Sequence, residues 1–241
     1  METISRLNPI VEALRSNPQR VHKIFIQKEA RHKKISQIIW LAHEHHIPFL
    51  FVPRQKLDSI DKNHQGAVAM LSPKEFSSLE SILKASEQPF LLLLDGVEDP
   101  QNFGAIVRNA EGGGVDGIVI PERHSVGLTS TVASVSAGAL EHVKIARVKN
   151  LAQTADMLKE RDIWIIGAES GGSSYWYEFD YTQSVAIILG SEGHGLRPLI
   201  KKKCDKILSL PLFGKVSSLN VASAASIFIY EVIRQRMNAG R

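Results

Sequence analysis

From Pro89 onward, short apolar segments alternate with amphipathic segments, and this alternation constrains the fold more than any other feature of the chain. Two of the apolar segments, residues 90–94 (FLLLL) and 185–189 (VAIIL), carry no polar residue at all. A strand of that kind must be covered on both faces, as in a parallel sheet. We predict strands at residues 90–94, 117–120, 143–148, 163–168, 185–189 and 207–210, and helices at 103–111, 130–137, 152–160, 199–204 and 218–236. Strands that alternate with helices predict the α/β class.

The first third of the chain has a different pattern, that of a small α+β domain. We predict helices at residues 4–16, 35–44 and 57–60, and strands at 21–26, 49–52 and 65–70. The stretch that follows is polar and rich in Ser, Lys and Glu, which is typical of a linker with one or two helical turns. The predicted organisation is a domain at 1–73, a linker at 74–88 and a larger domain at 89–241.

Positive charge is concentrated in the first of these parts. Residues 1–73 hold 11 Lys+Arg and 6 Asp+Glu, whereas residues 74–241 hold 18 and 19. A basic module beside a nearly neutral one favours a polyanionic partner such as RNA. Small basic domains are common, so this surplus alone does not identify the partner.

The composition is that of an ordinary globular protein, 44% hydrophobic and 22% charged. No apolar run approaches the ~20 residues that a membrane span needs, and the N-terminus lacks a signal-peptide core. Cys204 is the single cysteine, which excludes internal disulfides and cysteine-based zinc clusters. We expect a soluble cytoplasmic protein that uses neither membrane nor metal.

Three segments of the larger domain carry candidate chemistry, and the first is residues 95–110 (DGVEDPQNFGAIVRNA). It joins a strand to a helix without the G-x-G-x-x-G of dinucleotide-binding folds, which argues against a Rossmann-type site. Asn102 stands at the predicted helix start, where its side chain can cap backbone N–H groups. Arg108 follows six residues later, and by itself it would be read as a solvated arginine.

The second segment, residues 187–196 (IILGSEGHGL), places three glycines within six residues after an apolar strand. Glycine permits a tight turn with positive φ and close approach of a ligand. A phosphate loop is excluded because no Gly-Lys-Ser/Thr follows, and Glu192 would repel a phosphate. Backbone groups with one carboxylate suit a zwitterionic ligand with a sulfonium better. His194 is interpreted as a loop residue without a catalytic role.

The third segment, residues 210–221 (LPLFGKVSSLNV), reads as a strand end, a glycine turn and a helix start. Ser217 or Ser218 is predicted as the N-cap of the long final helix. The small residues at 222–226 (ASAAS) would let another backbone approach that helix closely.

Other clusters are weaker candidates. The run 43–46 (HEHH) lacks the spacing of a metal site and is predicted to be a solvated helix end. The run 201–203 (KKK) is interpreted as a solvated face, with RNA contact as a minor alternative. Trp164 lies in an apolar strand and is predicted to be buried. For residues 175–177 (YWY), stacking on RNA bases remains open.

Taken together, the three segments resemble the motifs of the SpoU/TrmH family of RNA ribose 2′-O-methyltransferases, which belongs to the SPOUT class. Residues 7–14 (LNPIVEAL) and 64–69 (HQGAVA) resemble the N-terminal domain of one subgroup, which is similar to small RNA-binding ribosomal proteins. Within the family, the chain most resembles the bacterial 23S rRNA guanosine-2′-O-methyltransferases of the peptidyl-transferase loop.

The resemblance implies a SPOUT-type parallel-sheet domain with a C-terminal trefoil knot, a homodimer, and S-adenosyl-L-methionine as cofactor. It implies catalytic roles for a set that combines all three motifs: Asn102, Arg108, Glu192, Ser218 and Asn220. It implies that the cofactor is bound by Leu189, Gly190, Glu192, Gly193, Leu210 and Leu219. In the family the arginine holds the target phosphate or ribose and is thought to help remove the hydroxyl proton. Because a guanidinium stays protonated near neutral pH, we expect Arg108 to position the substrate and stabilise charge rather than to act as a base.

The predicted function is 2′-O-methylation of a guanosine ribose in 23S rRNA, either free or in an assembly intermediate. The first alternative is a tRNA ribose methyltransferase of the same family. The second is a non-catalytic RNA-binding factor on the same fold.

Overall fold

The computed structural model describes residues 1–30, 32–172, 174–191 and 193–240, and the chain divides into two compact units. Unit 1 comprises Met1–Glu75 together with Gly127–His142, and unit 2 comprises Phe76–Val126 with Val143–Arg241. Each unit is described by itself. None of the helices in the described part of the chain combines the length and apolar character that crossing a membrane requires.

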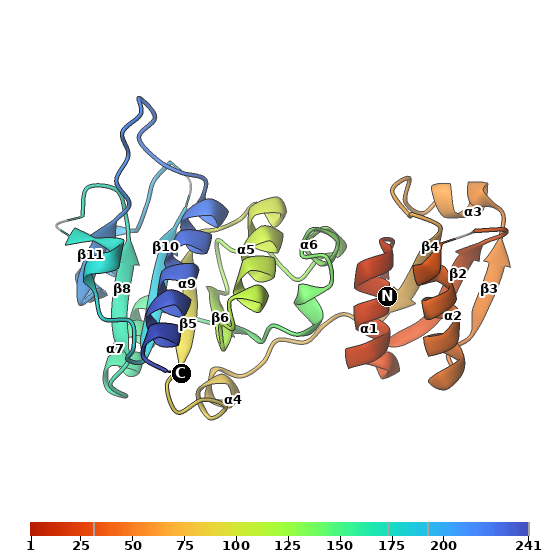
Figure 1. Cartoon of the computed structure of the whole chain (residues 1–241), viewed down its shortest axis with the longest axis horizontal. Helices are drawn as coiled ribbons and strands as arrows, with labels where there is room; N and C mark the ends of the chain where they lie inside the picture. Colours follow the sequence, from red (N-terminus) through yellow and green to blue (C-terminus); the bar gives the residue numbers. More distant parts are fainter. Residues whose placement is uncertain (31, 173, 192, 241) are drawn as a thin grey trace. The chain divides into compact units, whose positions relative to one another are not determined.

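Unit 1 is built on a four-stranded sheet with the strand order β1-β4-β2-β3. The pairs β1–β4 and β4–β2 are antiparallel, and β2–β3 is parallel. The strands are β1 (Glu2–Ile4), β2 (Val21–Gln27), β3 (Phe49–Val52) and β4 (Ala67–Leu71), and the helices between them are α1 (Leu7–Ser16), the 3₁₀ turn η1 (Pro18–Arg20), α2 (Lys33–Glu44) and α3 (Arg54–Asp58). The helices and strands predicted from the sequence are present, and β1 is an additional strand (Figure 1).

A segment from the middle of the chain completes unit 1. Gly127–His142 contains α6 (Ser130–Val135) and the 3₁₀ turn η2 (Ala139–Glu141), and both pack with the N-terminal residues. Between them, Gly138 has φ +106°, and an added Cβ would lie 2.7 Å from Cγ of Glu12. Glycine is therefore required there for both its backbone angle and its lack of a side chain.

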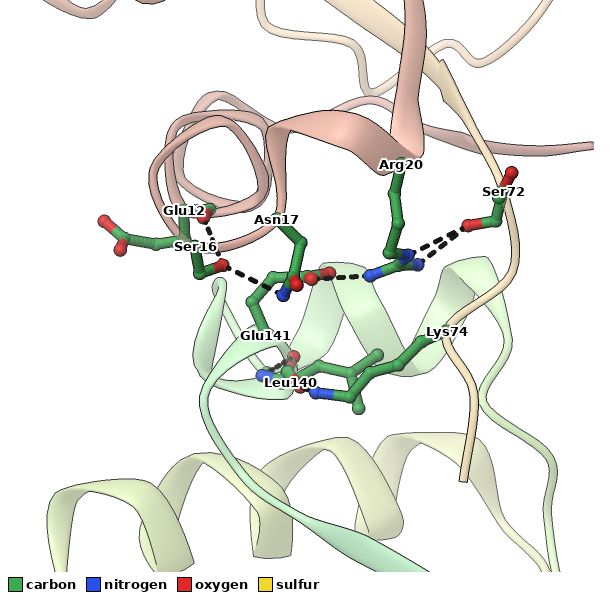
Figure 2. A network of polar contacts seen from close by, with 9 residues as sticks. Glu12, Ser16, Asn17, Arg20, Ser72, Lys74, Leu140 and Glu141 are labelled. Carbon is green, nitrogen blue, oxygen red and sulfur yellow. Dashed lines mark hydrogen bonds and ion pairs between the residues drawn. The ribbon is translucent and has the colours of Figure 1, made fainter. Parts of the chain in front are cut away.

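A polar network joins this segment to the N-terminal part of unit 1 (Figure 2). Arg20 donates to a Glu141 carboxylate oxygen at 2.6 Å and to the Ser72 carbonyl at 2.8 Å. The Lys74 ammonium donates to the Leu140 carbonyl. Burial lowers the pKa of Lys74 to about 8, because desolvation disfavours the charged ammonium. Contacts far apart in the sequence thus hold the segment in unit 1.

Unit 2 contains a seven-stranded sheet in which every pairing is parallel, with the order β7-β6-β5-β10-β8-β11-β9. The strands are β5 (Phe90–Asp95), β6 (Gly117–Pro121), β7 (Ile145–Val148), β8 (Trp164–Ala168), β9 (Ser174–Tyr175), β10 (Val185–Gly190) and β11 (Lys206–Ser209). The predicted parallel α/β sheet is confirmed. The trefoil knot that the resemblance implies stays a prediction.

Helices cover this sheet on both faces. They are α4 (Leu79–Leu83), α5 (Pro100–Gly112), α7 (Leu151–Lys159), α8 (Pro198–Lys203) and α9 (Val221–Asn238), with a 3₁₀ turn η3 (Trp176–Glu178). Alternate residues of β5, Leu91 and Leu93, are buried against α4, α7 and α8. Helices α5 and α9 pack against each other (Figure 1). The two all-apolar strands β5 and β10 are neighbours at the centre of the sheet, as their composition predicts.

One prediction about this core was wrong. Trp164 is 37% exposed, although it lies in an apolar strand. It is the first residue of β8, so its ring stands at the end of the sheet. There the indole N–H donates to Oε1 of Gln183 at 2.9 Å and the ring meets Phe179 edge-on. The exposure of Trp164 is therefore set by its position at the end of the strand and not by the apolar character of the segment.

Candidate functional site

The first two candidate segments begin side by side at one edge of the sheet in unit 2. Strand β5 ends at Asp95 and β10 ends at Gly190, and these two residues are paired in the parallel register. Carboxyl ends of parallel strands form the usual ligand-binding edge of such sheets. Both segments therefore leave the sheet toward the same region.

The start of α5 differs from the sequence prediction. Asp99 is its N-cap: its two carboxylate oxygens accept from the backbone N–H groups of Gln101 at 3.2 Å and Asn102 at 3.1 Å. Asn102 was predicted as the cap, and that was wrong, because Pro100 takes the first helical position and moves the cap one residue before it. The Asn102 side chain instead accepts a hydrogen bond from Asn220.

The start of α9 differs as well. Asn220 is the N-cap, with its Oδ1 accepting from the N–H groups of Ala222 at 2.9 Å and Ser223 at 3.3 Å. Ser217 and Ser218, the predicted caps, are wrong because the helix begins only at Val221. The Nδ2 group of Asn220 donates to Oδ1 of Asn102 at 2.7 Å. One side chain therefore caps a helix and joins the third motif to the first.

Packing of α5 against α9 holds this junction. The Asn109 amide donates to the Ala222 carbonyl at 3.2 Å and to the Ser226 hydroxyl at 2.6 Å. Both partners belong to the small-residue run for which the sequence predicts close backbone approach. This partly buried polar link fixes the two helices relative to each other.

The second segment forms a tight loop that needs its glycines. A Cβ on Gly190 would lie 2.2 Å from the carbonyl carbon of Gly195, far inside contact distance. Gly193 and Gly195 have φ of +83° and +65°, and Gly195 N–H donates to the Ser191 carbonyl at 3.0 Å. Glu192 lies outside the residues that the structure describes.

An ion pair that sequence reasoning missed, between a buried carboxylate and a half-exposed arginine, holds the end of this loop. The Asp95 side chain is fully buried, and its Oδ1 accepts from Nε of Arg197 at 2.7 Å. Its Oδ2 accepts from the backbone N–H of Arg197 at 3.0 Å. In the sequence, the charged Asp95 directly after an all-apolar strand indicates a residue that needs a polar partner. Nothing in the sequence indicates that this partner is Arg197, 102 residues away.

The first cavity, of about 320 Å³, lies where the second and third segments meet. Its walls include five of the six residues predicted to bind the cofactor: Leu189, Gly190, Gly193, Leu210 and Leu219. Ser218, predicted as catalytic, lines it too. Sequence reasoning missed Glu169 and Phe228, which also line it and come from segments without a motif. The Glu169 carboxylate is paired with the Lys201 ammonium at 2.6 Å.

A second cavity, of about 780 Å³, adjoins the first. It is lined by Asn102, by the Asp95–Arg197 pair and by His124. Both cavities share four wall residues, which are Ser191, His194, Gly195 and Val221. His194, interpreted from the sequence as a plain loop residue, therefore lies between two hollows. The arrangement can hold two ligands side by side.

Arg108 is not among the residues that line either cavity. Its side chain is exposed on α5, six residues beyond Asn102, which is about 9 Å along the helix axis. No hydrogen bond or ion pair joins it to any other residue in the described part of the chain. A single chain therefore brings three of the predicted catalytic residues together around the cavities: Asn102, Ser218 and Asn220. Arg108 lies apart from them.

Comparison with known proteins places this site in a family. The model of the SpoU rRNA Methylase family matches residues 89–230, which include all three segments. The chain belongs to this family. A second family model, RNA 2′-O ribose methyltransferase substrate binding, matches residues 7–77.

Relatives and solved structures agree with this assignment. The putative TrmH family tRNA/rRNA methyltransferase YacO of Bacillus subtilis is 42% identical over 238 residues, covering 97% of this chain and 95% of its own. The crystal structure of the SpoU methyltransferase AviRb from Streptomyces viridochromogenes is 24% identical with a TM-score of 0.83, covering 99% of this chain and 90% of its own. The A. aeolicus TrmH/SpoU tRNA modifying enzyme is 30% identical with a TM-score of 0.59, covering 67% and 82%.

These findings confirm the resemblance predicted from the three motifs. The chain is a SpoU/TrmH-family RNA methyltransferase with an N-terminal substrate-binding domain of the family. The roles of single site residues and the domain boundaries at 73 and 89 stay predictions.

Proposed function

We propose that this protein, in the cytoplasm, transfers a methyl group from S-adenosylmethionine to the 2′-hydroxyl of a guanosine ribose in 23S rRNA, free or in an assembly intermediate. The observation that carries the proposal is the 2.7 Å hydrogen bond between Asn102 and Asn220, which joins the first and third motifs beside two adjoining cavities. A methyl-transfer reaction needs the methyl donor and the acceptor held in contact. Two cavities with a common wall can hold them next to each other.

The first cavity fits the proposed cofactor. Its volume of about 320 Å³ lies within the usual range for small-molecule sites. Leu189, Leu210 and Leu219 give it apolar walls for an adenine ring. Gly190, Gly193 and Gly195 have no side chains, so this part of the wall presents backbone N–H and C=O groups to a ligand.

When bound, the cofactor would supply a methyl group on a sulfonium, which is electrophilic. The ribose oxygen would then bond to the methyl carbon as the bond from that carbon to sulfur breaks, and the hydroxyl proton would leave to solvent. We assign Asn102, Ser218 and Asn220 to orienting ribose and methyl donor. Glu192, outside the described residues, keeps the active-site role that the resemblance implies.

Arg108 is assigned to holding the target phosphate or ribose and stabilising charge, with a second copy of the chain bringing it to the site. Its exposure on α5, away from both cavities of its own chain, supports this assignment. The active form proposed is therefore a homodimer, in which residues of one protomer complete the site of the other. A guanidinium is a poor base but a strong electrostatic group, so positioning is its role.

The choice of rRNA rests on the basic substrate-binding domain and its likeness to small ribosomal proteins. Relatives are described as tRNA/rRNA methyltransferases, so tRNA is the second candidate. The two are separated by offering the protein labelled S-adenosylmethionine with unmodified 23S rRNA and unmodified tRNA in parallel. We expect label in the rRNA. Label in tRNA alone would contradict the proposed substrate, and absence of cofactor binding by calorimetry would favour the non-catalytic alternative.

A further inference from the structure

Unit 1 carries a group of aromatic side chains outside its buried core, of which Trp40, His43 and Phe51 are exposed and Phe49 is half-buried. Trp40 on α2 is 61% exposed and Phe51 on β3 is 53% exposed. Between them, the His43 ring meets Phe49 edge-on at 5.1 Å, and Phe49 meets Phe51 edge-on at 5.8 Å. We call Trp40, His43, Phe49 and Phe51 the aromatic patch.

The patch spans two elements, and ring contacts join His43 on α2 to Phe49 and Phe51 on β3. Trp40 and His43 are three residues apart on α2, so they share a helix face. Phe49 and Phe51 pair in register with Ile24 and Ile26, which places both on the α2 side of the sheet. Large exposed apolar surfaces rimmed by polar residues mark interaction sites.

Positive charge surrounds the patch. Residues 33–56 hold four Lys+Arg and one acidic residue, Glu44. Lys33 lies two turns before Trp40 on the same exposed face of α2. Arg54 and Lys56 follow directly after β3 and are exposed, and Arg54 also forms an exposed ion pair with Asp58 at 3.5 Å. A polyanion is therefore the complementary partner.

A second copy of this chain fits the patch less well. Strand β3 is an edge strand, but it is only four residues long, and short edges limit strand pairing. The same cations on both copies would also repel. Unpaired nucleotides match both features, because bases stack on aromatic rings while Lys and Arg contact the phosphates.

We propose that the aromatic patch binds unpaired RNA bases by stacking, with Lys33, Arg54 and Lys56 contacting the flanking phosphates. The inference rests on the proposed function and names the surface by which unit 1 selects single-stranded over duplex RNA.

The test uses the full chain and two probes, a 12-nucleotide oligouridylate and a 12-base-pair RNA duplex, with affinity read by fluorescence anisotropy at fixed salt. The double variant Trp40→Ala/Phe51→Ala is expected to bind the single strand about tenfold more weakly, the effect of losing a stacking platform, and to bind the duplex as the wild type does. Leu50→Ala is the matched control. Leu50 is 48% exposed on the same strand, but it pairs in register with Phe25 and so faces the other side of the sheet.

Trp40→Phe keeps a ring and is expected to restore most of the affinity, which a purely structural role for the indole would not predict. Wild-type affinity of the double variant for the single strand would overturn the proposal. So would equal weakening by Leu50→Ala, or a change of oligomeric state in sedimentation that accompanies the loss. Methyl transfer by the wild-type protein is assayed separately, so failure of the proposed function appears there and failure of the patch appears in the binding data.

Discussion

The two sides of the site in unit 2 are held very differently. On one side, Asp95 is fully buried and paired with Arg197, and Asn102 is hydrogen-bonded to Asn220 at 2.7 Å. On the other side, Phe213 is 98% exposed and Val216 is 74% exposed, both in the third motif. We call these the anchored side and the uncovered side.

This contrast separates what one chain assembles alone from what needs a second chain. The anchored side grows from buried strands and helix starts, so its polar groups keep fixed positions. The uncovered side places apolar residues of a motif in solvent, although exposed Phe is costly relative to burial. A second protomer that covers this side, and brings its Arg108, would account for both features.

The largest effect on turnover is expected for Arg108, which lies apart from the anchored side. Arg108→Ala should lower turnover by about 100-fold or more, the loss associated with one preorganised charged group. Its thermal unfolding should stay like the wild type, because the side chain is exposed. Turnover is measured with labelled cofactor. Arg161→Ala, another exposed arginine of unit 2, is the control, and wild-type turnover in Arg108→Ala would remove its assigned role.

Breaking the Asp95–Arg197 ion pair should destabilise the anchored side and so lower the stability of the folded chain. Arg197→Ala removes the guanidinium from the buried Asp95 carboxylate and leaves only the backbone N–H of residue 197 as its partner, which should lower the free energy of unfolding by about 2 kcal/mol. Urea unfolding measures it. Arg197→Lys keeps the charge and should recover part of the loss. If Arg197→Ala were as stable as the wild type, the pair would not be what holds the loop.

Two substitutions separate the capping role of Asn220 from its hydrogen bond to Asn102. Asn220→Ala removes the cap of α9 and should cost about 1 kcal/mol of stability. Asn220→Asp keeps an acceptor for the cap but cannot donate to Asn102, so turnover should fall while stability remains within about 0.5 kcal/mol of the wild type. Unfolding and methyl-transfer measurements on both variants test this. Full activity in Asn220→Asp would mean that the Asn102 contact does not matter to the reaction.

The smallest effect on stability is expected on the uncovered side. Phe213→Ser should change the unfolding free energy of the chain by no more than about 0.5 kcal/mol, because the ring is in solvent. It should nevertheless weaken self-association, which analytical ultracentrifugation measures. Lys215→Ser, in the same loop, is the control. Unchanged association in Phe213→Ser would argue against a partner that covers this side.

Periodicity predicted most of the fold, because the segments it depends on are local. The six main strands and the long helices of unit 2 follow from runs such as FLLLL and from helical spacing. The packing of Gly127–His142 into unit 1 did not follow, since it depends on contacts such as Arg20–Glu141 between residues 121 apart. Spacing along the chain carries no signal for such pairs.

The site was predicted in part for the same reason. The motifs named the residues, and the structure places five predicted cofactor residues around one cavity. The caps were wrong at both helix starts, where Asp99 and Asn220 took the roles given to Asn102 and the serines. Several residues near a helix start can serve as its cap, and only the backbone geometry decides among them.

The most direct test of the central claim is to map the methyl group. The wild-type protein is incubated with labelled S-adenosylmethionine and 23S rRNA that lacks its modifications, and the product is cleaved by alkali, which spares linkages next to a 2′-O-methyl ribose. We expect one alkali-resistant linkage, at a guanosine in a single-stranded region, and its loss with Arg108→Ala. Label on a base rather than a ribose, or label spread over many positions, would contradict this expectation.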